Sequence, residues 1–353
     1  MSIKETVSTA LSRWTGEGGA ESDVVISSRI RVARNLADFP FPHRLSEEGA
    51  EQVLQAVTLA VKSTGGQDAK ELQMTVMSEL SQVERQILVD KHLVSPDLLE
   101  NYKQKAVVLN NDESISIMIN EEDHLRLQCF LPGLHLHEAW SEVNRIDDLL
   151  ERTLDYAFDE RLGYLTACPT NVGTGMRASL MLHLPGLVLV NQISGVLATI
   201  SKLGFAVRGL YGEGTEATGN LFQISNQVTL GQTEEDIIAG IVSVAGQIIA
   251  SERSARQALY RERREHIEDR VGRAWGLLKH ARIMTSEEAM RLFSDLRLGK
   301  DLNIIDTIPG HLITELMIAT RPAFLLKIVG KELSSFERDV KRAELIRLKL
   351  SEA

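Results

Sequence analysis

The stretch AVVLNNDESISIMINEEDHLRLQCFL, residues 106–131, indicates the fold class of this 353-residue chain. It contains three short apolar segments of strand length, which are residues 106–109, 114–119 and 125–131. The Asn-Asn-Asp run at 110–112 separates the first two, and such residues are typical of a β-hairpin turn. Short strands joined by tight turns predict an antiparallel sheet rather than repeated βαβ units.

Helical patterns surround these strands. Residues 50–61 and 137–158 place apolar side chains at helical spacing, and the apolar residues 187–203 are expected to pack on the sheet. Two further strands, 206–210 and 220–225, flank a Gly-rich loop. The predicted class is therefore α+β, with an antiparallel sheet flanked by helices.

The composition changes after about two thirds of the chain. Residues 251–273 are densely charged with a helical pattern. Ser/Thr-x-x-Glu capping boxes at 285–288 and 334–337 mark two later helix starts, and no strand pattern of any length appears there. We predict two domains, an α+β domain over 1–254 and a small all-α domain over 255–353.

The net charge of −10 is unevenly distributed. Residues 1–251 hold 19 Lys and Arg against 33 Asp and Glu, whereas residues 252–353 hold 20 against 16. An acidic first part repels nucleic acid and attracts cationic partners, such as a protein with exposed arginines. The alternative is that the acidity only keeps the protein soluble.

Targeting signals and metal-binding patterns are not evident in the sequence. The first thirty residues hold no long apolar run, and no apolar stretch is long enough to cross a bilayer uninterrupted. The two cysteines, Cys129 and Cys168, suggest neither a disulfide framework nor a zinc site. We expect a cytoplasmic protein without a membrane span or a metal bound by its own side chains.

Five arginines in short, distinctive contexts are the candidate functional residues: Arg29, Arg31, Arg126, Arg177 and Arg208. A guanidinium matches phosphate oxygens bidentately and keeps its charge at any working pH. The acidic run at 120–124 adjoins Arg126, so the pattern favours phosphoryl transfer to a basic acceptor. Surface salt bridges are the alternative for any one arginine. No P-loop motif and no His-Arg-Asp or Asp-Phe-Gly set occurs, which excludes P-loop enzymes and standard protein kinases.

The segments CPTNVGTGMRAS, residues 168–179, and NEEDHLR, residues 120–126, resemble those of the ATP:guanidino phosphotransferases. These are the phosphagen kinases, such as creatine and arginine kinase, and the similarity runs from about Asp23 to about Glu252. The resemblance implies a nucleotide site formed by the five arginines and their neighbours, with His92 near it. The expected ATP-binding residues are Ser27, Ser28, Arg29, Ile30, Arg31, His92, Arg126, Arg177, Ala178, Ser179, Leu180, Met181, Arg208, Gly209, Leu210, Tyr211, Gly212 and Glu213. For His92, a surface or capping role is nearly as well supported.

The same resemblance implies three catalytic residues. Glu122 would take the proton of the acceptor guanidinium, whose pKa above about 12 prevents it from acting as a nucleophile while charged. Glu213 would bind a second edge of that guanidinium, and Cys168 would help to position it without a covalent intermediate. The alternatives are a solvated loop carboxylate for Glu213 and a small apolar residue for Cys168, as we expect for Cys129.

Two departures from the phosphagen kinases point to the protein-arginine kinase branch of the family. The helical N-terminal domain of phosphagen kinases is missing before Ser27, and about a hundred helical residues follow the kinase-like part. There, Arg338, Asp339 and Arg342 match an allosteric phosphoarginine-binding motif. Charge spacing alone favours an ordinary solvated helix face for these three residues.

The resemblance thus implies a kinase that transfers the γ-phosphoryl group of Mg-ATP to arginine side chains of proteins. It also implies a heat-shock repressor as substrate, a Clp ATPase and protease as partners, an activator protein and a homo-oligomer. The alternatives are a kinase of a free guanidino metabolite and a catalytically silent phosphoarginine-binding adaptor.

Overall fold

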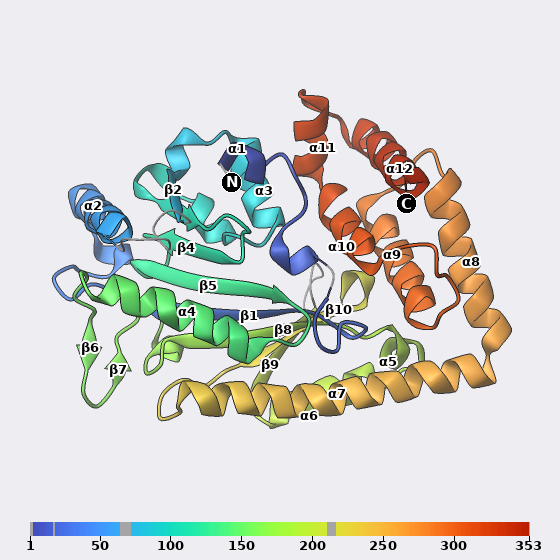
Figure 1. The fold of residues 1–353 in the computed structure, drawn as a ribbon, viewed down its shortest axis with the longest axis horizontal. Coiled ribbons are helices and arrows are strands. Elements are labelled where there is room, and N and C mark those ends of the chain that lie inside the picture. Colours follow the sequence, from blue (N-terminus) through green and yellow to red (C-terminus); the bar gives the residue numbers. More distant parts are fainter. Residues whose placement is uncertain (1–2, 17, 64–71, 210–216, 353) are drawn as a thin grey trace.

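The computed structural model describes residues 3–16, 18–63, 72–209 and 217–352. An eight-stranded sheet forms the centre, in the order β2-β3-β4-β5-β1-β8-β10-β9, and every neighbouring pair is antiparallel (Figure 1). The strands are β1 Val25–Arg34, β2 Gln73–Val76, β3 Ala106–Leu109, β4 Ile115–Ile119, β5 Leu125–Pro132, β8 Met176–His183, β9 Phe205–Gly209 and β10 Leu221–Asn226. A separate hairpin pairs β6 Phe158–Asp159 with β7 Gly163–Tyr164. The α+β prediction is confirmed.

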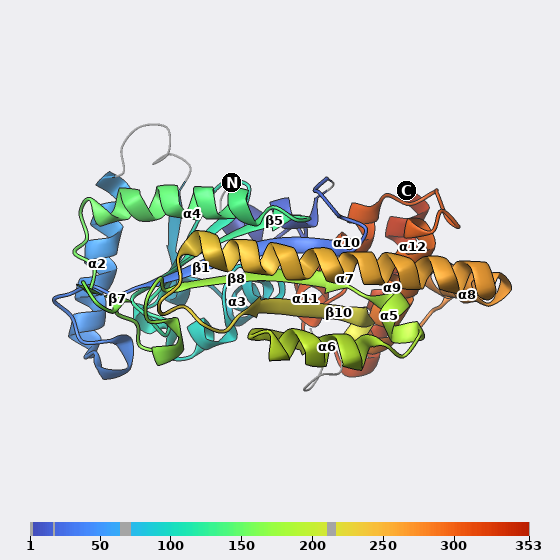
Figure 2. The same cartoon turned by 90° about the horizontal axis from the view of Figure 1, so that it is seen from below.

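Helices α4 (Leu136–Glu151) and α7 (Glu234–Glu262) cover one face of this sheet. Figure 2 shows α7 running along the length of the sheet between α4 and α6 (Ile193–Lys202), which packs on the same face. Apolar residues alternate along the central strands, so Ile30 and Leu180 face these helices within one buried core. By length and composition α7 could cross a membrane, yet its apolar side chains pack into this core.

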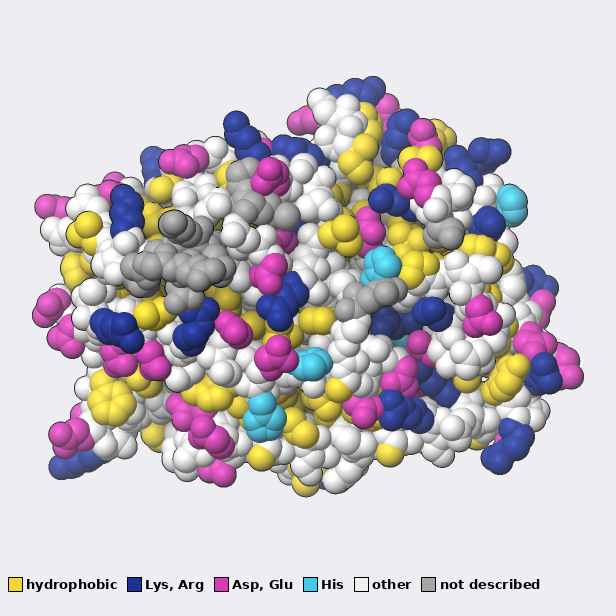
Figure 3. Space-filling model, viewed as in Figure 1, with side chains coloured by type: hydrophobic (Ala, Val, Ile, Leu, Met, Phe, Trp, Pro, Cys, Tyr) yellow, Lys and Arg dark blue, Asp and Glu magenta, His cyan; other side chains and the backbone are white. Residues whose placement is uncertain are grey.

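The opposite face of the sheet is covered by elements from both ends of the chain, among them α3 (Gln82–Asp90). A second core joins Phe130 and Met181 of the sheet to Phe293 and Leu316 of the C-terminal helices. The remaining helices are α1 Ile3–Thr6, α2 Glu47–Ser63, α5 Pro185–Leu189, α8 Arg264–His280, α9 Ser286–Asp301, α10 Gly310–Ala319, α11 Pro322–Val329 and α12 Ser335–Glu352. In Figure 3, Lys and Arg side chains are frequent over this helical region at the upper right.

Three details of the structure bear on the sequence-based expectations. The apolar stretch 187–203 is divided between two helices, α5 and α6, with Asn191 at a left-handed φ of 57° between them. The expected domain boundary at 254 falls inside α7, which continues unbroken to Glu262. The C-terminal helices also share their core with the sheet, because they bury the apolar side chains of its second face.

Candidate active site

The five arginines lie on one face of the sheet, on strands β1, β5, β8 and β9. Arg31 is paired with Gln128 on one side and with Arg177 on the other, and Arg29 is paired in the same way with Phe130 and Ser179. Directly paired residues of antiparallel strands project to the same face of a sheet. Ala33 is paired with Arg126, and Gln223 is paired with Arg208, so these two arginines project to the same face. This arginine face is opposite to the face that packs on α4 and α7.

Neutral partners hold these guanidinium groups in place. Arg29 donates from Nε to Oγ of Ser179 at 3.3 Å and from NH2 to Oε1 of Gln223 at 3.1 Å. Arg177 donates from NH2 to Oγ of Ser225 at 3.0 Å. Within residues 3–16, 18–63, 72–209 and 217–352, no carboxylate forms an ion pair with Arg29, Arg31, Arg177 or Arg208. The arrangement orients positive charge without neutralising it.

Burial and mutual repulsion both disfavour the charged form of these guanidinium groups. Desolvation lowers the pKa of Arg29 to about 10, with further lowering from Arg177 and Arg126. The pKa of Arg31 is lowered well below its usual value by burial and by its arginine neighbours, and its Nε has no hydrogen-bond partner. Burial and the charge of Arg208 lower the pKa of Arg177. A polyanion on this face would relieve both costs, so the face is suited to bind a polyphosphate.

His92 lies beside this face, as the sequence suggested. Its ring stacks on Phe130 with 6.4 Å between centroids and meets Trp14 edge-on at 5.6 Å. The guanidinium of Arg29 lies 5.1 Å from the Phe130 ring centroid. Desolvation and the charge of Arg29 lower the pKa of His92 to about 3, so the ring is neutral at working pH. A neutral aromatic cluster next to these arginines is suited to accept a nucleotide base.

Glu122 stands where the arginine face meets solvent. Arg126 donates from NH1 to Glu121 at 2.9 Å and from NH2 to Oε2 of Glu122 at 2.6 Å. Glu121 also accepts from Ser95 Oγ at 2.6 Å and is buried, whereas the Glu122 side chain is 42% exposed. Desolvation raises the pKa of Glu122, although Arg126 acts in the opposite direction. A raised pKa makes Glu122 a better proton acceptor while it remains accessible.

A cavity of about 650 Å³ adjoins Glu122, and none of the five arginines lines it. Carboxylates dominate the charged part of its wall, which includes Glu47, Asp97 and Glu100. Cys168 lies near its rim, since Ala167 belongs to the same wall, and its Sγ is 3.0 Å from Oγ1 of Thr170. Arg177 is in electrostatic range of both Cys168 and Glu122. Arg177, Glu122 and Cys168 therefore lie close enough to influence one another electrostatically.

The strand geometry divides the side chains of the expected nucleotide site between the two faces of the sheet. Ile30, Ala178 and Leu180 are packed in the core on the α4 and α7 side. Ser28 is buried there as well, and its hydroxyl donates to the carbonyl of Gly133 at 2.7 Å. Because strand side chains alternate between faces, these four side chains cannot reach a ligand on the arginine face.

The other expected residues lie either on the arginine face, at the end of β9, or outside the residues that the structure describes. Ser27, Ser179 and Met181 alternate onto the arginine face, and Gly209 follows Arg208 at the end of β9. Leu210, Tyr211, Gly212 and Glu213 lie outside the residues that the structure describes, so their roles stay predictions.

Sequence reasoning missed several residues of the site. Gln223 and Ser225 hold Arg29 and Arg177, and Glu121 shares Arg126 with Glu122. Gln223 and Ser225 alternate with Phe222 and Ile224 along β10, which was a readable two-residue pattern. The role of Glu121 had no separate signal, because adjacent acidic residues look alike in a sequence.

The C-terminal motif is only partly exposed. Arg338 lines a cavity of about 630 Å³ between α3 and α11, and its NH1 donates to the carbonyl of Leu333 at 3.0 Å. Arg342 is buried instead, donating to the carbonyls of Thr320 and Met284 and to Asp339 at 2.5 Å. Arg342 therefore braces α12, and Arg338 is the more accessible of the two arginines. A phosphoarginine-binding role for Arg338, Asp339 and Arg342 stays a prediction. Arg338 and Asp339 are half-buried rather than fully exposed on their helix.

Comparison with known proteins agrees with this geometry. The family model of the ATP:guanido phosphotransferase C-terminal catalytic domain matches residues 52–255. The chain belongs to the ATP:guanido phosphotransferase family. The model of the protein-arginine kinase McsB C-terminal domain matches residues 264–353.

Two relatives match over nearly their whole length. The protein-arginine kinase of Pelotomaculum thermopropionicum is 62% identical over 98% of this chain and 98% of its own. That of Desulforamulus reducens is 58% identical over 99% of both chains.

Solved structures share the fold at low sequence identity. Lombricine kinase has a TM-score of 0.60 and 22% identity over 72% of this chain and 76% of its own. The duplicated taurocyamine kinase of Schistosoma mansoni has the same TM-score and 23% identity over 72% of this chain and 36% of its own. The shared part corresponds to a phosphagen kinase-like catalytic fold.

Proposed function

We propose that this chain is a protein-arginine kinase, which transfers the γ-phosphoryl group of ATP to arginine side chains of proteins. One observation carries the proposal: Arg29, Arg31, Arg177 and Arg208 form no ion pair with any carboxylate in the described part of the chain, and Glu122 stands at the edge of their face. The identity of the full-length relatives supports arginine in proteins as the acceptor.

In this mechanism the arginine face positions the phosphates and Glu122 activates the acceptor. A nitrogen of the acceptor guanidinium forms a bond to the γ-phosphorus while the bond from phosphorus to the β,γ-bridging oxygen breaks. The proton lost by that nitrogen passes to Glu122, and ADP leaves with the negative charge. The arginines stabilise charge on the transferring group, and most of the rate enhancement comes from position and electrostatics.

We propose that magnesium enters as the Mg-ATP complex. Among the described residues, no three His, Cys, Asp or Glu side chains gather as a metal site. The donors facing the phosphate region are guanidinium groups, which bind phosphate oxygens rather than cations. Bound Mg²⁺ would reduce the charge on the phosphates, and its ligands would come mainly from the nucleotide and water.

The acceptor side of the site favours a macromolecular substrate over a free guanidino metabolite. Glu122 is half-exposed beside a wide cavity with an acidic wall, so an arginine that projects from a protein can reach it. A positively charged acceptor is attracted by this wall. A silent adaptor would have no use for a raised pKa on an accessible Glu122.

A direct competition between acceptors tests this proposal. The protein is incubated with Mg-ATP, an arginine-rich protein and free arginine together, and phosphosites are mapped under non-acidic conditions that preserve the acid-labile N–P bond. We expect phosphoarginine on the protein and none on the free amino acid. Turnover of free arginine with an unmodified protein would instead identify a metabolite kinase.

We further propose the cellular setting implied by the family resemblance. The substrates would include a heat-shock repressor, and phosphorylated proteins would be delivered to a Clp ATPase and protease. An activator protein would stimulate the kinase, which would act as a homo-oligomer in the cytoplasm. Phosphorylation changes the charge of an arginine from positive to negative, which would release a repressor from DNA.

We also propose that the cavity beside Arg338 binds phosphoarginine and regulates activity. Lys327 and Lys331 line the same cavity, so three cations border one space of about 630 Å³. The Nζ of Lys327 already contacts Glu84 of α3 at 2.8 Å, which links the kinase part to the helical part across this cavity. A ligand that competes for Lys327 could therefore change how the two parts are held together.

Replacement of Arg338 separates regulation from catalysis. In Arg338→Ala, we expect phosphoarginine binding to weaken about tenfold or more, because a charge-assisted contact contributes about 1.5–3 kcal/mol. Basal kinase activity and ATP binding should stay near the original values. Calorimetry measures the affinity for phosphoarginine, and kinase rates with and without added phosphoarginine measure the activity. Equal phosphoarginine affinity in Arg338→Ala and the original protein would mean that the segment is an ordinary helix surface.

A further inference from the structure

A third cavity lies where the helical C-terminal region meets the start of β1. It has a volume of about 310 Å³, and its wall includes Arg297, Lys300, Asp301, Gly310 and Asp23. None of these residues belongs to the arginine face or to the cavity beside Arg338. This cavity is therefore separate from the arginine face and from the cavity beside Arg338.

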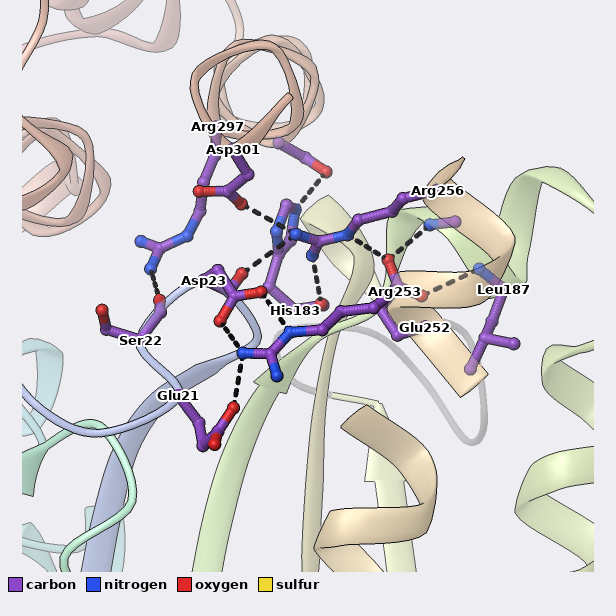
Figure 4. A network of polar contacts seen from close by, with 12 residues as sticks. Glu21, Ser22, Asp23, His183, Leu187, Glu252, Arg253, Arg256, Arg297 and Asp301 are labelled. Atoms are coloured by element: carbon purple, nitrogen blue, oxygen red, sulfur yellow. Dashed lines mark hydrogen bonds and ion pairs between the residues drawn. The ribbon is translucent and has the colours of Figure 1, made fainter. Parts of the chain in front are cut away.

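Arg297 is a buried cation with neutral hydrogen-bond partners. It is 7% exposed, and it donates from NH1 to Oγ1 of Thr314 at 3.1 Å and from NH2 to the carbonyl of Ser22 at 2.8 Å. Its Nε has no hydrogen-bond partner. Figure 4 shows its guanidinium extending from α9 toward Ser22. A buried guanidinium with an orphaned N–H is costly unless an acceptor can reach it.

The carboxylates in the same wall are paired elsewhere. Both oxygens of Asp23 accept from Arg253, and Oδ2 of Asp301 accepts from NH1 of Arg256 at 3.0 Å. Figure 4 shows both arginines reaching these carboxylates from α7. Arg297 forms no ion pair with a carboxylate of the described chain. Burial lowers the pKa of Arg297, whereas Asp301 and Asp23 raise it from beyond ion-pair distance and so offset part of its charge. The orphaned Nε of Arg297 and the charge of Lys300 are left for a ligand.

The beginning of α10 adds one backbone donor, the N–H of Gly310, to the same cavity. Gly310 is the first residue of this ten-residue helix, and Pro309 before it provides no side-chain cap. No hydrogen bond from the N–H of Gly310 is found in the described chain. The side chain of Lys300 passes beside this residue, since a Cβ at Gly310 would lie 3.5 Å from Cε of Lys300. The N-terminus of a helix carries partial positive charge and binds oxyanions through such free N–H groups.

We propose that this cavity is a binding site for a phosphate group, formed by Arg297, Lys300 and the N-terminus of α10. The cavity accepts inorganic phosphate or the phosphoryl group of a small metabolite, since both present the same oxygens. The site joins α9 and α10 to Ser22, three residues before β1 begins. A bound phosphate group therefore fastens the helical region to the strand that carries Arg29 and Arg31.

Hydrogen exchange tests the site in the full-length protein. Inorganic phosphate and O-phosphoserine are titrated separately, with the nucleotide site saturated by a non-hydrolysable ATP analogue so that the arginine face is occupied. We expect at least one of the two to protect the amides at 310–313 saturably. Protection by both identifies a site for phosphate itself, and protection by O-phosphoserine alone identifies a site for a phosphorylated metabolite.

One variant at a partly exposed residue and one at a buried residue test the site further. Lys300→Gln changes a partly exposed side chain, and we expect it to weaken the binding at least fivefold in a folded protein. Arg297→Gln should abolish it, with circular dichroism as the check on folding. Lys279→Gln is the matched control, because Lys279 lies over Trp275 outside this cavity. The proposal fails if neither ligand protects 310–313, or if Lys300→Gln binds like the original protein.

Discussion

Glu122→Gln is expected to abolish arginine phosphorylation while leaving ATP binding nearly unchanged. The amide keeps the size of the side chain and can still contact Arg126, but it cannot accept the proton from the acceptor guanidinium. General-base catalysis contributes roughly 10²–10⁴-fold, and we expect a loss toward the upper end, because a charged guanidinium is not a nucleophile. The loss should appear in kcat, since the base acts in the transition state.

A neighbouring carboxylate provides the control for this prediction. Glu100→Gln removes a negative charge from the same cavity wall without touching Arg126. It should alter the KM for a protein acceptor more than kcat, because Glu100 can attract the acceptor but cannot take its proton. Phosphate transfer to protein is measured for both variants, and ATP affinity is measured by calorimetry. Near-normal turnover in Glu122→Gln would remove Glu122 from the role of base.

Two arginines of β1 should respond in opposite ways to the same substitution. Arg31→Met removes a cation that has an orphaned Nε and repels its neighbours, so the ligand-free protein should be as stable as before or more stable, by about 1 kcal/mol. ATP binding should nevertheless weaken roughly 10–100-fold, because one charge-assisted phosphate contact is lost.

Arg34→Met is the matched variant on the other face of the same strand. Arg34 is buried against α4, where its NH2 lies 2.6 Å from Asp147 and its guanidinium stacks on Tyr164 at 3.5 Å. Removing one partner of a buried pair leaves the other charge uncompensated, so the free energy of unfolding should fall by about 3–5 kcal/mol. Denaturant titration of both variants measures the contrast. Strong destabilisation by Arg31→Met would mean that an unrecognised partner neutralises Arg31.

Part of the sheet could be predicted because β3 is wholly apolar and β4 and β5 are mostly apolar. Residues 106–109 form β3 as expected, and 114–119 and 125–131 contain β4 and most of β5. The two central strands, β1 and β8, were not predicted as strands. In β1, Arg29 and Arg31 alternate with Ile30 and Val32, and the charged residues obscured a two-residue period that was present. The arginines of the functional motif therefore concealed the strand pattern of β1.

The C-terminal region shows a different limit of sequence reasoning. Both predicted helix starts were correct, since Thr285 accepts from the N–H of Glu288, and Ser334 from that of Glu337. Only the second is a complete capping box among the described residues, because Glu337 accepts in return from the N–H of Ser334. Helical spacing also placed Arg338 and Arg342 on one side of α12. It could not reveal that Arg342 faces two backbone carbonyls of other segments, because these come from residues 22 and 58 positions away. Contacts of that kind depend on tertiary packing, which local patterns do not encode.

A crystal structure of the protein with Mg²⁺, a non-hydrolysable ATP analogue and an arginine-containing peptide tests the central claim most directly. The account predicts the triphosphate on the arginine face, in contact with Arg29, Arg31 and Arg177. It also predicts the peptide guanidinium within hydrogen-bonding distance of Glu122, between that carboxylate and the γ-phosphate. A triphosphate bound away from the arginine face, or a peptide arginine bound away from Glu122, would contradict it.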